Sequence, residues 1–156
     1  MNEDKEIRTF NIELRVDNGK PPSIDGYAAV FDQLSDDLGG FREKMENGFF
    51  DDALFGDTRA LFNHDRNFVL GRSTNNTLRM TQDDHGLRVH IDPPQTQLVN
   101  DMLLTPMKRG DIDQMSFAFT VNPDGEDWDF KSKPAIRTLK KGGALMLYDV
   151  SVVTLP

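Results

Sequence analysis

Short segments in which apolar and polar residues alternate recur along most of this 156-residue chain, and they restrict its fold more than any other feature. Alternation with a period of two predicts β-strands with one buried face, because successive side chains of a strand point to opposite sides. The clearest case is residues 115–121, where Met115, Phe117 and Phe119 alternate with smaller side chains. Further strands are expected at residues 10–16, 24–31, 41–44, 59–64, 69–72, 77–80, 87–91 and 144–153.

Helical signals are few by comparison. Residues 96–108 carry spaced apolar side chains and end at Gly110, which predicts one helix, although Pro106 removes a hydrogen bond and should kink or shorten its last turn. Residues 48–54 could form one or two helical turns. Many strands with few helices predict a β-rich α+β domain or a closed barrel.

Length and composition narrow the class of protein. A chain of this length predicts a single domain over residues 1–156, with a flexible start at 1–8 and a mobile polar loop at 122–135. The net charge of −8 argues against a nucleic-acid groove. The absence of cysteine excludes disulfides, thiolate zinc sites and thiol catalysis. No apolar run approaches membrane-spanning length, so we expect a soluble intracellular domain.

Two strands each carry one chemically capable polar side chain, His64 and Ser116. A serine beside a histidine is the minimal set for acyl transfer, since the imidazole takes the hydroxyl proton as the oxygen attacks a carbonyl. The pattern alone also allows a locally hydrogen-bonded serine and histidine. Asp149 lies in an apolar strand, where an ionised carboxylate needs a partner. A histidine or an arginine would serve.

The other histidines and acidic residues offer weaker alternatives. His85 is expected in an exposed turn and His90 on the polar face of a strand. A zinc site from His64, His85, His90 and an aspartate lacks the tight spacing of known motifs. The acidic stretch 124–129 lacks the ligand spacing of an EF-hand, so a solvated loop is the better interpretation.

Several short sequence motifs, spread over nearly the whole chain, match those of one known family. They lie at residues 24–31, 37–43, 59–65, 69–72, 109–119 and 149–156. In these phrases the chain resembles the prohead (capsid-maturation) serine proteases of tailed bacteriophages, which are distantly similar to the assemblin proteases of herpesviruses. The resemblance implies a small, mostly antiparallel β-barrel with peripheral helices.

The resemblance also implies roles for individual residues. His64 matches the catalytic histidine of the family and Ser116 its nucleophile. The third position of the family pattern is usually glutamate where this chain has Asp149. In the herpesvirus enzymes it is a histidine, which makes His90 the second choice. The sequence does not identify the groups that would donate hydrogen bonds to the oxyanion, and backbone amides would be sufficient. Arg72 is a weak candidate for this role, and a structural ion pair is an equally good explanation for it.

The partners implied by the resemblance are the major capsid protein precursor, through its scaffolding segment, and the protease itself. The expected location is the immature procapsid in the bacterial host cytoplasm, with no cofactor, no metal, no membrane and no nucleic acid as primary partner. The cleavage-site sequence, self-association and any need for assembly stay open. Family members typically continue past Pro156 into a polar tail, so this end is consistent with self-cleavage or truncation.

Two functions other than proteolysis are compatible with parts of the sequence. A non-catalytic assembly or scaffold-binding module on the same fold is the main alternative, and the presence of both His64 and Ser116 favours the enzyme. A hydrolase of small esters is disfavoured because the chain has no Gly-x-Ser-x-Gly elbow.

Overall fold

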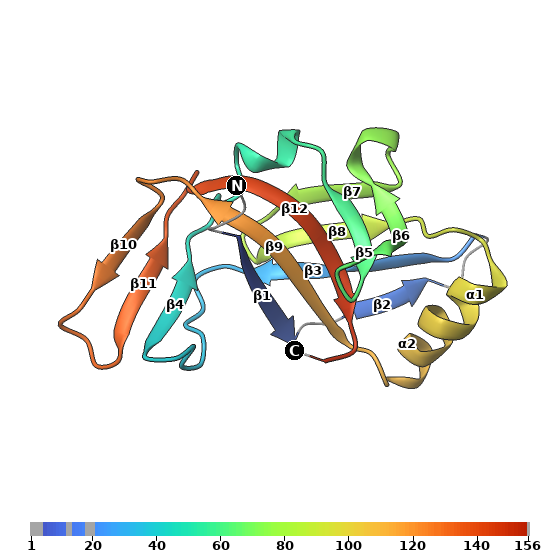
Figure 1. The fold of residues 1–156 in the computed structure, drawn as a ribbon, viewed down its shortest axis with the longest axis horizontal. Coiled ribbons are helices and arrows are strands. Elements are labelled where there is room, and N and C mark those ends of the chain that lie inside the picture. Colours follow the sequence, from blue (N-terminus) through green and yellow to red (C-terminus); the bar gives the residue numbers. More distant parts are fainter. Residues whose placement is uncertain (1–4, 12–13, 18–20, 156) are drawn as a thin grey trace.

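Three β-sheets and one helix make up the part of the chain that the structure describes, residues 5–11, 14–17 and 21–155 of a computed structural model (Figure 1). No helix within those residues is long and apolar enough to cross a membrane. The strands are β1 (Glu6–Asn11), β2 (Leu14–Asp17), β3 (Ser23–Val30), β4 (Phe41–Met45), β5 (Arg59–Phe62), β6 (Asp65–Arg72), β7 (Leu78–Gln82), β8 (Gly86–Ile91), β9 (Gln114–Val121), β10 (Glu126–Asp129), β11 (Ala135–Leu139) and β12 (Ala144–Val153).

The largest sheet has the strand order β1-β9-β12-β5-β6. Its pairs are antiparallel except for β12 with β5, which run parallel. Strands from the middle and the end of the chain therefore lie side by side at its centre, as the adjacent β9, β12 and β5 of Figure 1 show. This arrangement brings residues near 64, 116 and 149 into one neighbourhood.

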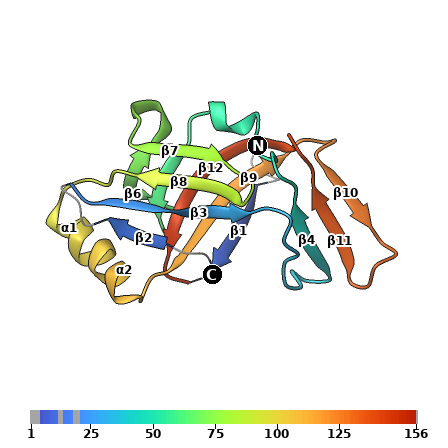
Figure 2. The ribbon, with the colours of Figure 1, turned by 180° about the vertical axis from the view of Figure 1, so that it is seen from behind.

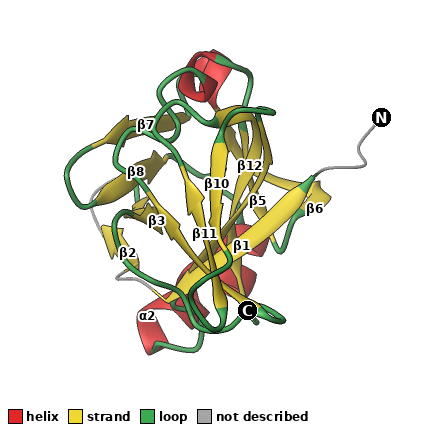
Figure 3. Ribbon diagram, turned by 90° about the vertical axis from the view of Figure 1, so that its left-hand side faces the viewer, coloured by secondary structure: helices red, strands yellow, loops and turns green. Residues whose placement is uncertain are grey.

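A second, antiparallel sheet of order β2-β3-β8-β7 packs against the first. Figure 3 looks along the molecule, with this second sheet on one side and β12, β5 and β6 on the other. The core between them includes completely buried Phe117, Phe119, Ile24 and Leu87. Burying such side chains stabilises the fold by about 1.5–3 kcal/mol each.

A third sheet, β10-β11-β4, extends from one end of the molecule, opposite the helix (Figure 2). Its strand β10 lies within residues 122–135, so part of the segment expected as a loop is strand. The alternation there is masked by charged side chains, since Glu126 and Arg137 bind each other across β10 and β11.

The closed barrel that was expected is not formed by the pairings of the described strands. They give three open sheets, mostly antiparallel, in a β-rich α+β fold. The largest sheet ends at β6 and the second at β7, and the 3-10 turn η2 (Ser73–Asn75) turns the chain between those two strands.

The strand predicted over residues 10–16 is instead divided between two sheets. β1 begins at Glu6, within the start that was expected to be flexible, and pairs with β9, whereas β2 pairs with β3. Ile12 and Glu13, which belonged to the predicted strand, lie outside the described residues. Continuous alternation cannot reveal a change of sheet, because both strands keep the same period.

The helix runs from Gln97 to Arg109 in three parts: α1 (Gln97–Val99), the π-helical η3 (Asn100–Leu104) and α2 (Thr105–Arg109). Thr96 caps its start by accepting the N–H of Val99, and Gly110 ends it with φ of +84°. The wider π turn directly precedes Pro106, where the missing N–H and the ring would disturb α-helical bonding. The predicted helix at 96–108 is thus confirmed, with a π turn in place of a break.

The turns expected at residues 48–54 exist but are not α-helical. They end in the 3-10 helix η1 (Ala53–Phe55). Phe49 and Phe50 are completely buried there and join the core. The hairpin predicted from residues 77–80 and 87–91 is confirmed as β7 and β8.

Candidate active site

His64 occupies the second position of a two-residue turn between β5 and β6. Phe62 pairs with Asp65, and the two residues between them, Asn63 and His64, have φ of +55° and +57°. Both central residues of a type I′ hairpin need this left-handed backbone, which is uncommon for residues other than glycine and is adopted more often by asparagine and histidine than by most. The strand predicted to reach residue 64 therefore ends at Phe62, and His64 projects from a tight turn.

The turn is attached to β12 by hydrogen bonds from both of its residues. The N–H of Asn63 donates to the carbonyl of Val152 at 2.9 Å, and the N–H of His64 donates to the Ser151 hydroxyl at 3.2 Å. The Asn63 side chain accepts the N–H of Thr154 at 2.9 Å. These bonds fix the position of the His64 ring at the carboxyl end of β12.

Ser116 lies near the start of β9, on the face of the strand that carries small side chains. Met115 and Phe117 point into the core, as the alternation predicted, and Ser116 and Ala118 point to the opposite face. The cross-strand partners of Ser116 are Ser151 on β12 and Thr9 on β1. Ser116 is completely buried.

Asp149 reaches the same face through a β-bulge. Leu147 pairs with Phe119 and Asp149 with the adjacent Ala118, so Tyr148 is the extra residue of β12. The bulge turns Leu147 into the core, although a regular strand with a period of two would place Leu147 and Asp149 on the same face. Asp149 is only 5 % exposed, as the apolar strand around it suggested.

The three side chains form one hydrogen-bonded row. Nδ1 of His64 lies 2.6 Å from Oδ1 of Asp149, and Nε2 lies 2.7 Å from Oγ of Ser116. An ionised carboxylate only accepts, so Nδ1 carries the proton that faces Asp149, and in the neutral ring Nε2 accepts the Ser116 hydroxyl. This tautomer can take a proton from Ser116 while the carboxylate stabilises the charged ring.

Ser151 is a fourth member of this row that the sequence did not single out. Its hydroxyl donates to Oδ1 of Asp149 at 2.8 Å and accepts the backbone N–H of His64. It is completely buried. Its only sequence signal is its place two residues after Asp149, which puts both side chains on one face of β12.

His90 lies in the other large sheet, on β8. Its Nδ1 is 2.7 Å from Asp25 and its Nε2 is 3.0 Å from Asp92, and neither ring nitrogen bonds to His64 or Ser116 in the described part of the chain. His85 is exposed in its turn, as predicted, with its ring edge-on to Tyr27 at 4.6 Å. Asp149 and His90 were the two candidates for the third catalytic residue, and the geometry favours Asp149.

Arg72, the weak candidate for oxyanion help, forms an ion pair away from the row of side chains. Its guanidinium donates to both carboxylate oxygens of Asp57, at 2.8 and 2.6 Å. This hydrogen bonding holds the pKa of Asp57 below its usual range, against the opposing effect of desolvation. The geometry favours the structural role for Arg72.

The candidate metal sites find no support in the arrangement of the described residues. No group of three or more His, Asp or Glu side chains among them is placed to hold a metal ion. Within the acidic stretch, Glu126 binds Arg137, and Asp129 accepts the hydroxyl of Ser132 and the N–H of Lys131. These carboxylates hold neighbouring parts of the chain together.

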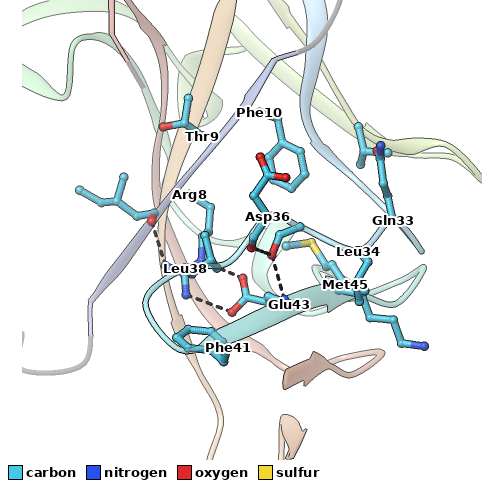
Figure 4. A pocket seen from close by; sticks show the side chains of 14 residues that line it. Arg8, Thr9, Phe10, Gln33, Leu34, Asp36, Leu38, Phe41, Glu43 and Met45 are labelled. Carbon is cyan, nitrogen blue, oxygen red and sulfur yellow. Dashed lines mark hydrogen bonds and ion pairs between the residues drawn. The ribbon is translucent and has the colours of Figure 1, made fainter. Parts of the chain in front are cut away.

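A groove of about 670 Å³ lies beside β1, on the side away from β9 (Figure 4). Arg8, Thr9 and Phe10 line one wall, and Leu34 and Met45 are among the residues of the opposite wall. The groove does not include Ser116, His64 or Asp149, but its residue Thr9 is the cross-strand partner of Ser116.

Comparison with protein families identifies the family of this chain. Residues 9–156 match the model of a protein family described as Caudovirus prohead serine protease. The search of curated proteins and the search of solved structures found no match.

Proposed function

This chain belongs to the Caudovirus prohead serine protease family, whose members are capsid-maturation proteases, and we propose that it uses Ser116, His64 and Asp149 to cleave the scaffolding segment of the major capsid protein precursor. The observation that carries the assignment of residues is the unbroken row of hydrogen bonds from Asp149 through His64 to Ser116, at 2.6 and 2.7 Å. Both distances lie within the range of a nucleophile, a base and a group that orients the base.

In the first half of the reaction, Oγ of Ser116 attacks the carbonyl carbon of the scissile peptide bond. Its proton passes to Nε2 of His64, and Asp149 stabilises the imidazolium. His64 then gives this proton to the leaving nitrogen as the C–N bond breaks, which releases an amine and leaves an acyl ester on Ser116.

In the second half, His64 takes a proton from a water molecule, whose oxygen attacks the ester carbon. The bond to Oγ breaks, the proton returns to Ser116, and the new carboxyl terminus leaves. The groups needed are an activated hydroxyl, a ring held in one tautomer and a buried carboxylate, and all three are side chains of this chain.

The same proposal includes cleavage of the protease itself and action inside the immature procapsid of the phage, in the bacterial host. It treats residues 1–156 as one protease domain. Self-association is left open, since no feature described above requires a second copy.

Co-expression with the cognate capsid protein precursor tests the proposal. The precursor should lose its scaffolding segment beside the unaltered protein and keep its full mass beside Ser116→Ala. The His90→Gln variant is a matched control, because it also changes a partly buried polar contact but lies in the other sheet. An unchanged precursor mass in every sample would favour the non-catalytic assembly module instead.

A further inference from the structure

The completely buried state of Ser116 conflicts with its proposed role, because a peptide carbonyl must come within about 3–3.5 Å of its Oγ. Ala118, which follows Ser116 on the same face of β9, is small, and the strand beside Ser116 on one side is β12, which carries Asp149 and Ser151. The strand on the other side is β1. β12 carries part of the candidate site, so an extended peptide could reach Ser116 along β9 only if β1 moved away.

β1 runs antiparallel to β9 in continuous register, with Thr9 directly opposite Ser116. We call the backbone of residues 114–119 that faces β1 the β9 edge. Strands in a sheet lie about 4.8 Å apart, so a chain paired to the β9 edge brings its backbone close to Oγ of Ser116. A chain paired to the outer side of β1 would lie about 10 Å from the Ser116 backbone, which is too far for attack.

The groove beside β1 is thus not where the scissile bond binds. In the strand order of the described sheets, β1 pairs only with β9 and is therefore an edge strand. Its residues 7–10 line the groove (Figure 4). An edge strand can leave a sheet without breaking a second ladder of hydrogen bonds.

The side chains of β1 are held mostly by polar contacts. None of the residues from Glu6 to Phe10 is buried, whereas every residue of β9 from Met115 to Thr120 is buried. Phe10 stacks on Phe117 at 6.0 Å. Further attachments are the contact of the Arg8 guanidinium with the Phe119 ring and ion pairs of Arg8 with Glu43 at 2.8 Å and of Glu6 with Arg137 at 2.6 Å.

β9 also carries an acceptor that the described residues leave unused. Oε1 of Gln114 is buried and has no hydrogen-bond partner among them. Gln114 precedes Ser116 by two residues and lies on the same face of β9. A peptide on the β9 edge would bring N–H donors past this oxygen.

We propose that β1 occupies the binding track of the substrate, and that the substrate is an extended peptide that displaces β1 and pairs with the β9 edge as an added strand. β1 then acts as a removable cover of Ser116, and strand addition supplies main-chain hydrogen bonds as in other β-augmentation complexes. This inference rests on the proposed function, because it assumes that Ser116 attacks a peptide.

A disulfide between β1 and β9 tests the proposal. Ile7 and Ala118 are cross-strand partners, and the chain has no cysteine of its own, so Ile7→Cys with Ala118→Cys gives a single defined bridge. The oxidised protein, verified by its mass, should cleave a precursor peptide at least about 100-fold more slowly than the same protein after reduction. Thr81→Cys with Arg88→Cys places a matched bridge between β7 and β8, where reduction should change nothing.

A second variant acts in the opposite direction. Glu6→Gln removes the charge that holds β1 to Arg137 on β11, so β1 should open more often and the cleavage rate should rise about three- to tenfold in a protein that remains folded. Equal cleavage by the oxidised and reduced β1–β9 bridge, or a folded Glu6→Gln protein that is not faster, would overturn the cover. Failure of the proposed function looks different, because the reduced and unaltered proteins would then also leave the peptide intact.

Discussion

Two histidines of this protein have nearly the same first contact and different second contacts. Nδ1 of His64 lies 2.6 Å from Asp149, and Nδ1 of His90 lies 2.7 Å from Asp25. Nε2 of His64 faces the hydroxyl of Ser116, whereas Nε2 of His90 faces a second carboxylate, Asp92. Carboxylates accept hydrogen bonds and hydroxyls also donate them, so only His64 has a proton within reach that it can take.

The settings of the two rings differ as well. His90 lies in a regular strand, with Arg79 and Asp25 as its cross-strand neighbours. His64 lies in a left-handed turn that is bonded to β12. A histidine–aspartate contact is thus a common structural device, and it becomes a candidate for catalysis through what the other ring nitrogen meets.

The largest expected effect separates the two rings directly. His64→Ala should lower kcat/KM for a precursor peptide by about 10⁴- to 10⁶-fold, because the base is lost and the nucleophile is left unactivated. His90→Ala should change it by no more than about threefold. Steady-state cleavage assays on both folded variants measure this, and comparable losses would remove the distinction between the rings.

The aspartates provide the next test. Asp149→Asn should lower kcat by about 10³- to 10⁴-fold, since an amide can donate to Nδ1 and favour the wrong tautomer of His64. Asp25→Asn makes the same chemical change beside His90 and should leave kcat within about threefold. Activity retained in Asp149→Asn would show that the third catalytic group has been misassigned.

The sequence predicted the residues of the candidate site better than it predicted how those residues are arranged in space. Alternation around Ser116 predicted its face, and the apolar run around Asp149 predicted a buried carboxylate that needs a partner. The pairing of β12 with β5, which brings Asp149 to His64, joins residues about 90 positions apart and has no local signal. Only the resemblance to the protease family suggested that Asp149 lies beside His64.

Three local features were hidden by patterns that resemble regular strands. Asn63-His64 lacks the glycine usual in a type I′ turn, so the predicted strand extended through it to residue 64. The bulge at Tyr148 changed the face of Leu147 without any glycine to mark it. The polar strand β10 is held by an ion pair of Glu126 with Arg137 and shows no apolar face.

Serines beside the two aspartates sharpen the comparison further. Ser151 donates to Asp149 at 2.8 Å, and Ser23 reaches Asp25 only at 3.5 Å. Ser151→Ala should lower kcat by about 10- to 100-fold with little change in KM, because Asp149 and the His64 turn lose a common support. Ser151→Thr keeps the hydroxyl and should recover part of the loss. Ser23→Ala, the matched variant, should behave as the unaltered protein, and an equal decrease in both alanine variants would mean a general effect on stability.

The smallest expected effect concerns the Asn63-His64 turn, which has no counterpart at His90. Asn63→Ala should lower the free energy of unfolding by about 1–2 kcal/mol, because alanine is strained at φ of +55° and cannot accept the N–H of Thr154. Asn63→Gly removes the hydrogen bond but adopts the left-handed backbone without strain, so it should lose less than alanine does. Urea unfolding of the two variants measures both terms. If glycine destabilises as much as alanine, the loss comes from the hydrogen bond to Thr154, and backbone strain at residue 63 adds nothing to the cost of the alanine variant.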